Sequence, residues 1–307
     1  MQTISIINYK GGVGKTTISA NLAAELAFRG KNVLVIDLDP QASLTFSYFS
    51  VDDWRNKYEK TKTIKNWYDA FIDKDADLDL SSLIVRPGRV NSAGLKGKVD
   101  AICSHLALIN VDLDLATRLV GGSARDLRNN YLRVHSRLRQ GLASLDPDLY
   151  HFCLIDCPPN FNIVTKNAIV ASDYLLVPTK PDYLSTLGID QLKTHFRELV
   201  STYNGYVKET DDEQWEAISP EILGVLFTMI SVRNGAPISA QQQYIQQVRG
   251  QVATLDTYIR ENKTIYADAP EYGVPVVLKR VSGRTYEDVQ DELEELTTEL
   301  MDKLDGK

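Results

Sequence analysis

The 307-residue chain has few cysteines and no long apolar run. Its three cysteines, Cys103, Cys153 and Cys157, include no C-x-x-C pair, and their odd number argues against a disulfide framework or a zinc site. No apolar stretch approaches the roughly 18 residues that a membrane helix needs. Met1 leads into an apolar strand pattern rather than a signal peptide. We therefore expect buried thiols, no membrane association and a place in the cytoplasm.

An excess of positive charge is also missing, because the formal net charge is −7. Alone, this value argues weakly against nucleic acid as a partner. The acids are unevenly placed, however: nine acids and one lysine lie between Glu287 and Asp305, and with Lys307 this end accounts for the whole net charge. The preceding 286 residues are neutral overall, so basic clusters among them can still bind a polyanion such as nucleic acid.

What the chain does have is a regular alternation of strand and helix patterns. Apolar strand patterns lie at residues 3–8, 32–37, 152–156, 174–178 and 222–228, with helical patterns between them. The first helix is rich in alanine and leucine and is predicted to end at Gly30. Near-continuous apolar strands separated by helices predict an α/β fold with a doubly wound, mostly parallel sheet flanked by helices.

Two segments depart from this alternation. Residues from about 46 to 110 are less regular, and we interpret them as an insertion in a single domain spanning residues 1–307. The acidic end is predicted to be a helix over about 286–305. Its apolar positions form one helical stripe, expected to pack on the domain core: Val289, Leu293, Leu296, Leu300 and Leu304.

The segment KGGVGKTT, residues 10–17, follows a strand and precedes a helix. This is the context of a P-loop, whose backbone N–H groups turn inward on phosphate oxygens at a helix N-terminus. Lys15 is expected to reach the β- and γ-phosphates, and the Thr16 hydroxyl to ligate Mg²⁺. A glycine-rich surface turn is the alternative, which the spacing disfavours. The expected nucleotide contacts are Lys10, Gly11, Gly12, Val13, Gly14, Lys15, Thr16 and Thr17.

Acids follow two of the strand patterns. VLVIDLDPQAS places Asp37 and Asp39 at the carboxyl end of a strand, the edge where ligands bind in doubly wound sheets. An Asp-Pro turn explains Asp39 but leaves Asp37 unexplained. HFCLIDCPPN ends a strand at Asp156, as a Walker B acid does to hold hydrated Mg²⁺. Thr16, Asp39 and Asp156 are the candidate metal residues.

One further segment, TYIRENKTIYADAPEYGVPV at residues 257–276, contains a candidate contact to the nucleotide base. Asn262 follows an apolar-aromatic stretch, and its amide has the donor and acceptor that a base edge needs. An ordinary loop is the simpler interpretation of the same residues.

Together, KGGVGKTT with Lys10, DLDPQ and LIDCPPN resemble the ParA family of DNA-partitioning ATPases, a branch of the deviant-Walker-A P-loop proteins that include MinD and the nitrogenase iron protein. The similarity extends to NVDLDLATRLVGG, LLVPTKPDYLSTLGID, GVLFTMI and ADAPEYGVPV, and omits about residues 46–106. The resemblance implies that Lys10 reaches across a two-fold interface to the phosphates held by another subunit. Lys10, Lys15 and Asp39 would then serve catalysis, with Asp39 positioning the attacking water.

The resemblance also implies ATP and Mg²⁺ as cofactors, an ATP-bound homodimer and non-specific binding to double-stranded DNA on the nucleoid. A ParB-like partner would stimulate hydrolysis, so that plasmid, chromosome or protein cargo is partitioned. Candidate DNA contacts, each of which is otherwise an ordinary solvated face, are Lys193, Arg197, Arg249, Lys279 and Arg280.

Other functions remain open at this point. A membrane-cycling ATPase of the MinD type is the main alternative, although the polar face of the terminal helix is acidic and anionic lipid would repel it. A nucleotide-dependent scaffold or filament with negligible hydrolysis is a third possibility. The nitrogenase branch needs cysteines that ligate a cluster, whereas Cys153 and Cys157 lie at the Walker B strand and look structural.

Overall fold

The computed structural model describes residues 1–74, 78–210, 212–233, 235–280 and 282–306. Within these ranges seven strands form one sheet in the order β3-β2-β4-β1-β5-β6-β9, and all neighbouring strands run parallel. The predicted doubly wound parallel sheet is therefore confirmed. Its strands are β1 (Gln2–Ile6), β2 (Asn32–Asp37), β3 (Lys98–Ile102), β4 (Phe152–Asp156), β5 (Tyr174–Thr179), β6 (Glu221–Ile230) and β9 (Thr254–Arg260). A separate hairpin pairs β7 (Val232–Arg233) with β8 (Ala236–Pro237).

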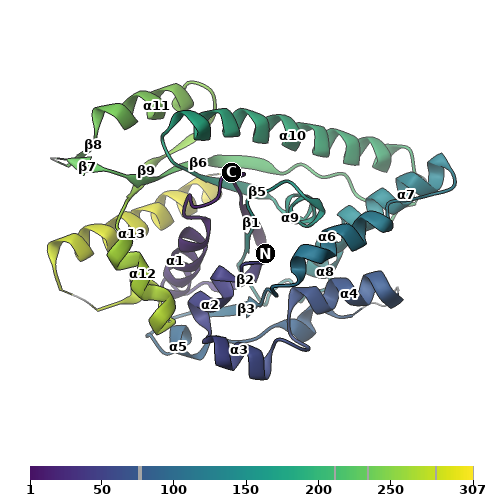
Figure 1. Cartoon of the computed structure of the whole chain (residues 1–307), viewed down its shortest axis with the longest axis horizontal. Coiled ribbons are helices and arrows are strands. Elements are labelled where there is room, and N and C mark those ends of the chain that lie inside the picture. Colours follow the sequence, from purple (N-terminus) through teal and green to yellow (C-terminus); the bar gives the residue numbers. More distant parts are fainter. Residues whose placement is uncertain (75–77, 211, 234, 281, 307) are drawn as a thin grey trace.

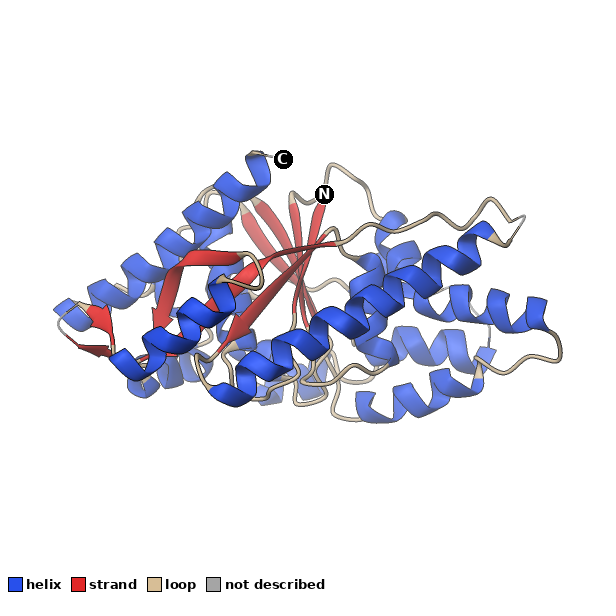
Figure 2. Cartoon of the chain, turned by 90° about the horizontal axis from the view of Figure 1, so that it is seen from above, coloured by secondary structure: helices blue, strands red, loops and turns tan. Residues whose placement is uncertain are grey.

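Helices cover both faces of the sheet (Figures 1 and 2). One face packs against α1 (Lys15–Phe28), α2 (Ser43–Tyr48), α3 (Val51–Lys57), α5 (Gly88–Asn91), α12 (Lys263–Tyr272), η2 (Val276–Leu278) and α13 (Arg284–Asp305). The other packs against α4 (Ile64–Lys74), η1 (Leu80–Leu83), α6 (Leu108–Thr117), α7 (Ala124–His135), α8 (Arg137–Ala143), α9 (Ile163–Ala171), α10 (Tyr183–Lys208) and α11 (Ser239–Arg249).

The central strands divide their side chains between these two cores. In β2, Val33 and Val35 pack on the side of α1, whereas Leu34 and Ile36 pack on the opposite side. Because a strand alternates its side chains and both faces are covered, the sequence reads as a continuous apolar run. The apolar runs of β2 and β4 each end in an acid, Asp37 and Asp156, and the parallel register places these two side chains together at the carboxyl edge of the sheet.

Helix α1 is fixed at both ends by glycine. It begins directly after the loop of residues 7–14, and its last helical residue is Phe28. Gly30 has φ 94°, its N–H donates to Ala27 O at 3.0 Å, and the N–H of Lys31 donates to Leu26 O at 3.0 Å. This pair of bonds is a Schellman motif, which closes a helix at a left-handed glycine.

The segment from about 46 to 110, expected to be irregular, is in part regular. It supplies α3, α4 and the edge strand β3, which pairs with β2. The apolar pattern of the sequence does not indicate β3, because Asp100 lies in the middle of this strand. Asp100 is buried, and it accepts hydrogen bonds from Arg86 Nε at 2.7 Å and Tyr150 Oη at 2.8 Å. Those partners make the buried carboxylate tolerable in a strand.

The terminal helix α13 runs from Arg284 to Asp305. Its apolar stripe is buried against the sheet and α1: Val289, Leu293, Leu296, Leu300 and Leu304. In the described part of the chain, no helix combines the length and apolar character needed to span a bilayer.

Candidate nucleotide and metal site

The loop between β1 and α1 has the backbone that phosphate binding requires. Gly12 and Gly14 have φ of 70° and 84°, conformations that side chains disfavour. The Val13 side chain is buried, and its carbonyl accepts a hydrogen bond from Thr228 Oγ1 at 2.8 Å. A cavity of about 490 Å³ lies against the loop, lined by Gly11, Gly12, Gly14, Lys15, Thr16 and Thr17 and also by Asp39, Ser43, Pro159, Met229 and Tyr266.

Lys15 is held inside this loop. Its side chain is largely buried, and Nζ donates to Asn8 O at 3.2 Å and to Lys10 O at 3.3 Å. Burial lowers the pKa of Lys15, while the nearby carboxylate of Asp156 opposes this shift. The lysine therefore lies at the floor of the cavity, where the phosphates of a nucleotide would replace carbonyl oxygens as its partners.

The structure brings two of the predicted metal residues into contact. Thr16 Oγ1 donates to Asp156 Oδ2 at 2.7 Å. Ser19, one helical turn further along α1, donates to Asp156 Oδ1 at 2.9 Å. Sequence reasoning missed Ser19, although its spacing places it on the same helix face as Thr16. Two hydroxyls from α1 thus fix the carboxylate that ends β4.

A second carboxylate lies beside Asp156. Asp37 ends β2 and is in register with Asp156 across the sheet. Both are buried, and burial raises the pKa of each; the charge of Asp156 raises that of Asp37 further. Oxygen ligands with excess negative charge suit Mg²⁺, and Thr16 adds a hydroxyl to the set. The residues present therefore fit a hydrated magnesium ion beside the P-loop.

Asp37 and Asp39 differ in their access to the cavity, although they are only two residues apart in the sequence. Asp39 borders the cavity, and its Oδ1 accepts a hydrogen bond from Gln41 N at 2.9 Å. Asp37 is fully buried, and its Oδ1 accepts from Asp39 N at 3.1 Å. Of these two aspartates, Asp39 is the one that borders the cavity, and Asp37 orders the loop beneath it.

Lys10 turns toward α10 of its own chain. Its Nζ donates to Asp182 Oδ2 at 2.7 Å and to Ser185 Oγ at 3.1 Å. Asp182 also caps α10, because its Oδ1 accepts a hydrogen bond from Ser185 N at 2.9 Å. This partner is not apparent from the sequence, because 171 residues lie between the lysine and the aspartate and only the fold brings them together.

A neighbouring cavity of about 490 Å³ continues past the loop glycines, and Asn262 lines it. Met229 and Tyr266 border both cavities. Asn262 Oδ1 accepts a hydrogen bond from Ile265 N at 3.0 Å, so this side chain also starts α12. The position suits a base contact, while the amide oxygen already has a structural partner. Sequence reasoning missed Met229, whose φ of 54° is unusual for a residue with a side chain.

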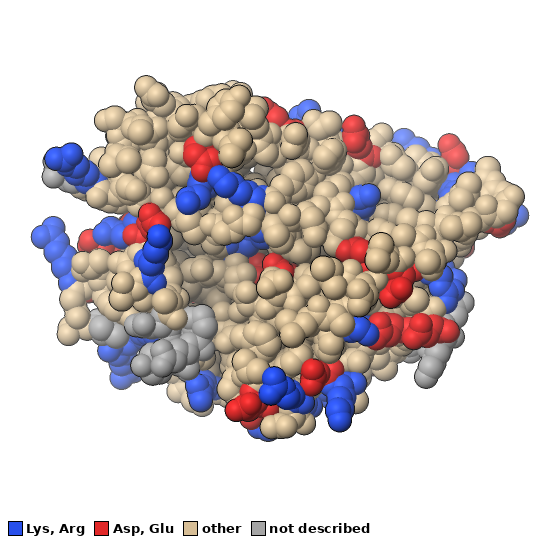
Figure 3. Space-filling view, viewed as in Figure 1, with Lys and Arg blue, Asp and Glu red and all other residues tan. Residues whose placement is uncertain are grey.

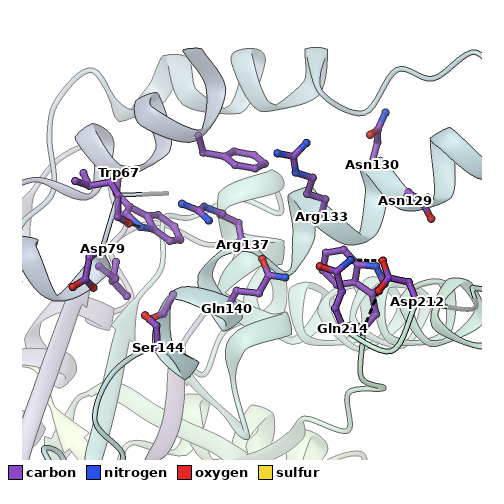
Figure 4. A pocket seen from close by; sticks show the side chains of 15 residues that line it. Trp67, Asp79, Asn129, Asn130, Arg133, Arg137, Gln140, Ser144, Asp212 and Gln214 are labelled. Atoms are coloured by element: carbon purple, nitrogen blue, oxygen red, sulfur yellow. Dashed lines mark hydrogen bonds between the residues drawn. The ribbon is translucent and has the colours of Figure 1, made fainter. Parts of the chain in front are cut away.

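A larger cavity of about 860 Å³ lies elsewhere, between α4, α7 and α8 (Figure 4). The Arg137 guanidinium lies 4.3 Å from the ring centroid of Trp67, and that of Arg133 lies 5.2 Å from Phe71. No P-loop residue is among the described residues that line this cavity. Its size therefore does not make it the nucleotide site, because phosphate binding needs the inward-facing amides of the loop.

The predicted DNA contacts fall into two groups. Lys193 on α10 donates to Gln251 O at 2.9 Å, which places it next to the end of α11 and Arg249. Arg249 Nη2 lies 3.6 Å from Asp256 Oδ1, and Arg197 is exposed on α10. Lys279 and Arg280 follow η2, on the other face of the sheet. In Figure 3, Lys and Arg side chains lie at the left end of the molecule, near the β7–β8 hairpin and the start of α13, and others are spread among acids over the rest of this face.

Comparison with known proteins gives consistent matches. A family model described as "AAA domain" matches residues 1–208. The chain is 29% identical to the sporulation initiation inhibitor protein Soj of Bacillus subtilis (strain 168) over 275 residues, 90% of each chain. It is 28% identical to the chromosome partitioning protein ParA of Caulobacter vibrioides (strain NA1000 / CB15N) over 91% of this chain and 87% of that one. Its fold resembles an ATP complex of a McdA variant from Cyanothece, with a TM-score of 0.69 and 21% identity over 98% and 96% of the two chains.

Proposed function

The chain belongs to the AAA domain family, in its branch of ParA- and MinD-type P-loop ATPases, and on this basis we propose that it is an ATP-switched partition ATPase. In this proposal residues 1–307 form one ATPase domain. ATP binding pairs two copies, and the pair binds double-stranded DNA on the nucleoid without sequence preference. Hydrolysis of ATP, stimulated by a ParB-like partner, releases the DNA, and repetition of the cycle moves a plasmid, a chromosome region or a protein cargo.

The observation that carries the proposal is the contact between Thr16 and Asp156 beneath the P-loop. Thr16, Asp156 and Asp39 would hold the magnesium ion and its water shell, and Lys15 would bind the β- and γ-phosphates. The ion would neutralise charge that develops on the phosphates during transfer. Asp39, bordering the same cavity, would orient the attacking water toward the γ-phosphate.

The surface around Lys10 supports pairing of two copies. The side chains of Lys10 and Asp182 are 34% and 42% exposed, so their ion pair lies where another subunit can approach. The residues that follow Asp182 on α10 expose apolar area: Tyr183 is 63% exposed, Leu184 68% and Leu187 46%. Exposed apolar side chains beside a ligand site are typical of an interaction surface. In the dimer, Lys10 would leave Asp182 for the phosphates of the partner's nucleotide.

DNA binding would use basic side chains on α10 and near α11, chiefly Lys193, Arg197 and Arg249. Each subunit neutralises few phosphates alone, and such contacts are weak at physiological salt. Two copies of the surface on one rigid dimer act on the same duplex, which raises the affinity without a new contact. Dimerisation thereby becomes the switch for DNA binding. Lys279 and Arg280 would provide a second surface.

The membrane-cycling alternative receives no support from helix α13. MinD-type proteins bind lipid through an amphipathic terminal helix. In α13 the apolar stripe is already buried in the core, as in Leu293 and Leu300, and the outward face is acidic. Sedimentation with anionic liposomes should therefore leave the protein in the supernatant with and without ATP.

Phosphate release tests the proposal directly. The wild-type protein should hydrolyse ATP with Mg²⁺, faster when DNA and the ParB-like partner are present, and should stop when the metal is chelated. The Lys15→Ala protein should release no phosphate under any of these conditions. Absence of hydrolysis by the wild type with DNA and partner would favour a nucleotide-dependent scaffold instead.

A further inference from the structure

The loop that carries Asp39 is tied to a residue from a distant part of the chain. Ser104, two residues after β3, donates its hydroxyl to Asp39 O at 2.7 Å. The backbone N–H of Ser104 donates to Thr45 Oγ1 at 2.9 Å. Ser104 is fully buried and Thr45 nearly so. Two hydroxyl side chains therefore lie directly behind the loop, on the side away from solvent.

Asp37 closes these contacts into a ring. Both the N–H and the Oγ1 of Thr45 donate to Asp37 Oδ2 at 2.8 Å, and Asp39 N donates to Asp37 Oδ1 at 3.1 Å. The Thr45 hydroxyl gives its one proton to Asp37 and accepts from Ser104, so its orientation is fixed. The chain of contacts runs from Asp39 N through Asp37, Thr45 and Ser104 back to Asp39 O.

We propose that Thr45 and Ser104 are positioning residues for the hydrolytic Asp39. The ring holds the backbone of Asp39 on both sides, at its N–H and at its carbonyl, and leaves the side chain to face the cavity. Neither Thr45 nor Ser104 is among the described residues that line that cavity, so both act through Asp39 rather than on the nucleotide. Small displacements of a group that orients a nucleophile lower the rate strongly.

This inference gives a role to the segment at about residues 46–110. Trp54 of α3 donates Nε1 to Ser104 O at 3.2 Å, so α3 and the end of β3 together hold the serine in place. Trp54 is buried. A segment that the sequence predicts to be a less regular insertion thereby supports the loop of Asp39 from behind. The inference rests on the proposed function, because it assumes that Asp39 orients the attacking water.

Thr45 offers a matched pair of variants for the test. Thr45→Val keeps the shape and removes the hydroxyl, and Thr45→Ser keeps the hydroxyl. Loss of one buried hydrogen bond shifts the equilibrium between the correct and the displaced position of the Asp39 loop by roughly tenfold. We expect kcat for ATP hydrolysis to fall about tenfold in Thr45→Val and in Ser104→Ala, with KM for ATP within about twofold of wild type. Thr45→Ser should retain most of the wild-type kcat.

The control is Thr297→Val in α13, where Thr297 Oγ1 is also buried and donates to Leu293 O at 2.9 Å. This variant loses a comparable hydroxyl far from the loop and should keep its kcat. Circular dichroism establishes that each variant is folded, and Ser104→Ala carries the test if Thr45→Val is not. Wild-type kcat in Ser104→Ala and in the folded Thr45 variant would overturn the positioning role, as would an equal loss in Thr297→Val.

Asp39→Ala in the same assay separates this inference from the proposed function. An inactive Asp39→Ala beside a fully active Ser104→Ala leaves the proposed function intact and refutes the ring. A fully active Asp39→Ala removes the catalytic role of Asp39 and the positioning role with it.

Discussion

Lys10 Nζ lies 2.7 Å from Asp182 Oδ2 in the same chain, so the lysine that distinguishes this P-loop already has an anionic partner in the monomer. The carboxylate of Asp182 has two roles: one oxygen pairs with Lys10, and the other caps α10. Transfer of Lys10 to a second subunit would require this contact to break. In the proposed dimerisation, this ion pair would therefore act as a restraint that can be measured.

Asp182→Asn should ease dimerisation. Asparagine caps a helix about as well as aspartate, so α10 should keep its start while Lys10 loses its charged partner. A partly exposed ion pair is worth up to about 1 kcal/mol, which limits the gain in dimer affinity to about fivefold. Analytical ultracentrifugation with ATP over a range of protein concentrations measures the dimer affinity.

Lys10→Ala should bind ATP yet fail to dimerise. Normal dimerisation and hydrolysis by this variant would refute the role given to Lys10.

Lys15→Ala should lower ATP affinity by about 100-fold, since charge-assisted hydrogen bonds to phosphate would be lost. Titration with a fluorescent ATP analogue provides the measurement. Lys60→Ala is a suitable control, because Lys60 is exposed and is not among the described residues that line the cavity. Unchanged affinity in Lys15→Ala would mean that the loop does not bind the phosphates.

Asp156→Asn should separate stability from activity. The substitution keeps the shape of the side chain and removes a buried charge that repels Asp37, so the nucleotide-free protein should melt at the same or a higher temperature. The same change would remove a ligand of the proposed magnesium site, and hydrolysis should fall below detection. Thermal melting without metal and phosphate release with metal give the two values. A strong loss of stability together with retained hydrolysis would contradict the assignment.

His135 should make the protein sensitive to acid. Its ring is buried, stacks on Tyr131 with centroids 4.0 Å apart, and burial lowers its pKa to about 4 from an ordinary 6.5. Between these values the unfolded chain binds the proton and the folded chain does not, so stability falls as pH drops from 6.5 toward 4. The full effect is on the order of 3 kcal/mol. Urea unfolding at several pH values should show this slope in wild type, and a smaller slope in His135→Phe; equal slopes would exclude His135 as the cause.

Much of the sheet could be predicted because its strands are buried on both faces. β2 and β4 occupy the residues that their apolar runs indicate, and each ends in an acid at the carboxyl edge. Strand β3 could not be predicted in this way, because it contains a buried acid. Asp100 is stabilised by hydrogen bonds from Arg86 and Tyr150, which lie elsewhere in the sequence. A pattern of apolar residues cannot reveal a charge that is neutralised by tertiary contacts.

The candidate site also has a part that the sequence predicts and a part that it does not. The P-loop glycines, Lys15 and Thr16 follow from local spacing, because one turn and one helix start position them all. The contacts of Lys10 with Asp182 and of Asp39 with Ser104 join residues far apart in the chain. Such pairs depend on strand order, and the sequence alone does not supply it. The assignment of DNA contacts also depends on which basic side chains the fold gathers on one face.

The most direct test of the account is a mobility-shift titration of the Asp39→Ala protein on double-stranded DNA with ATP, with ADP and without nucleotide, at two salt concentrations. This variant should bind ATP and remain dimeric, so it should shift DNA of any sequence with ATP alone, and less at the higher salt. Lys193→Ala with Arg197→Ala should weaken the shift, and Arg55→Ala with Lys60→Ala should leave it unchanged. Equal DNA binding in all three nucleotide states, or none with ATP, would contradict an ATP-switched partition ATPase.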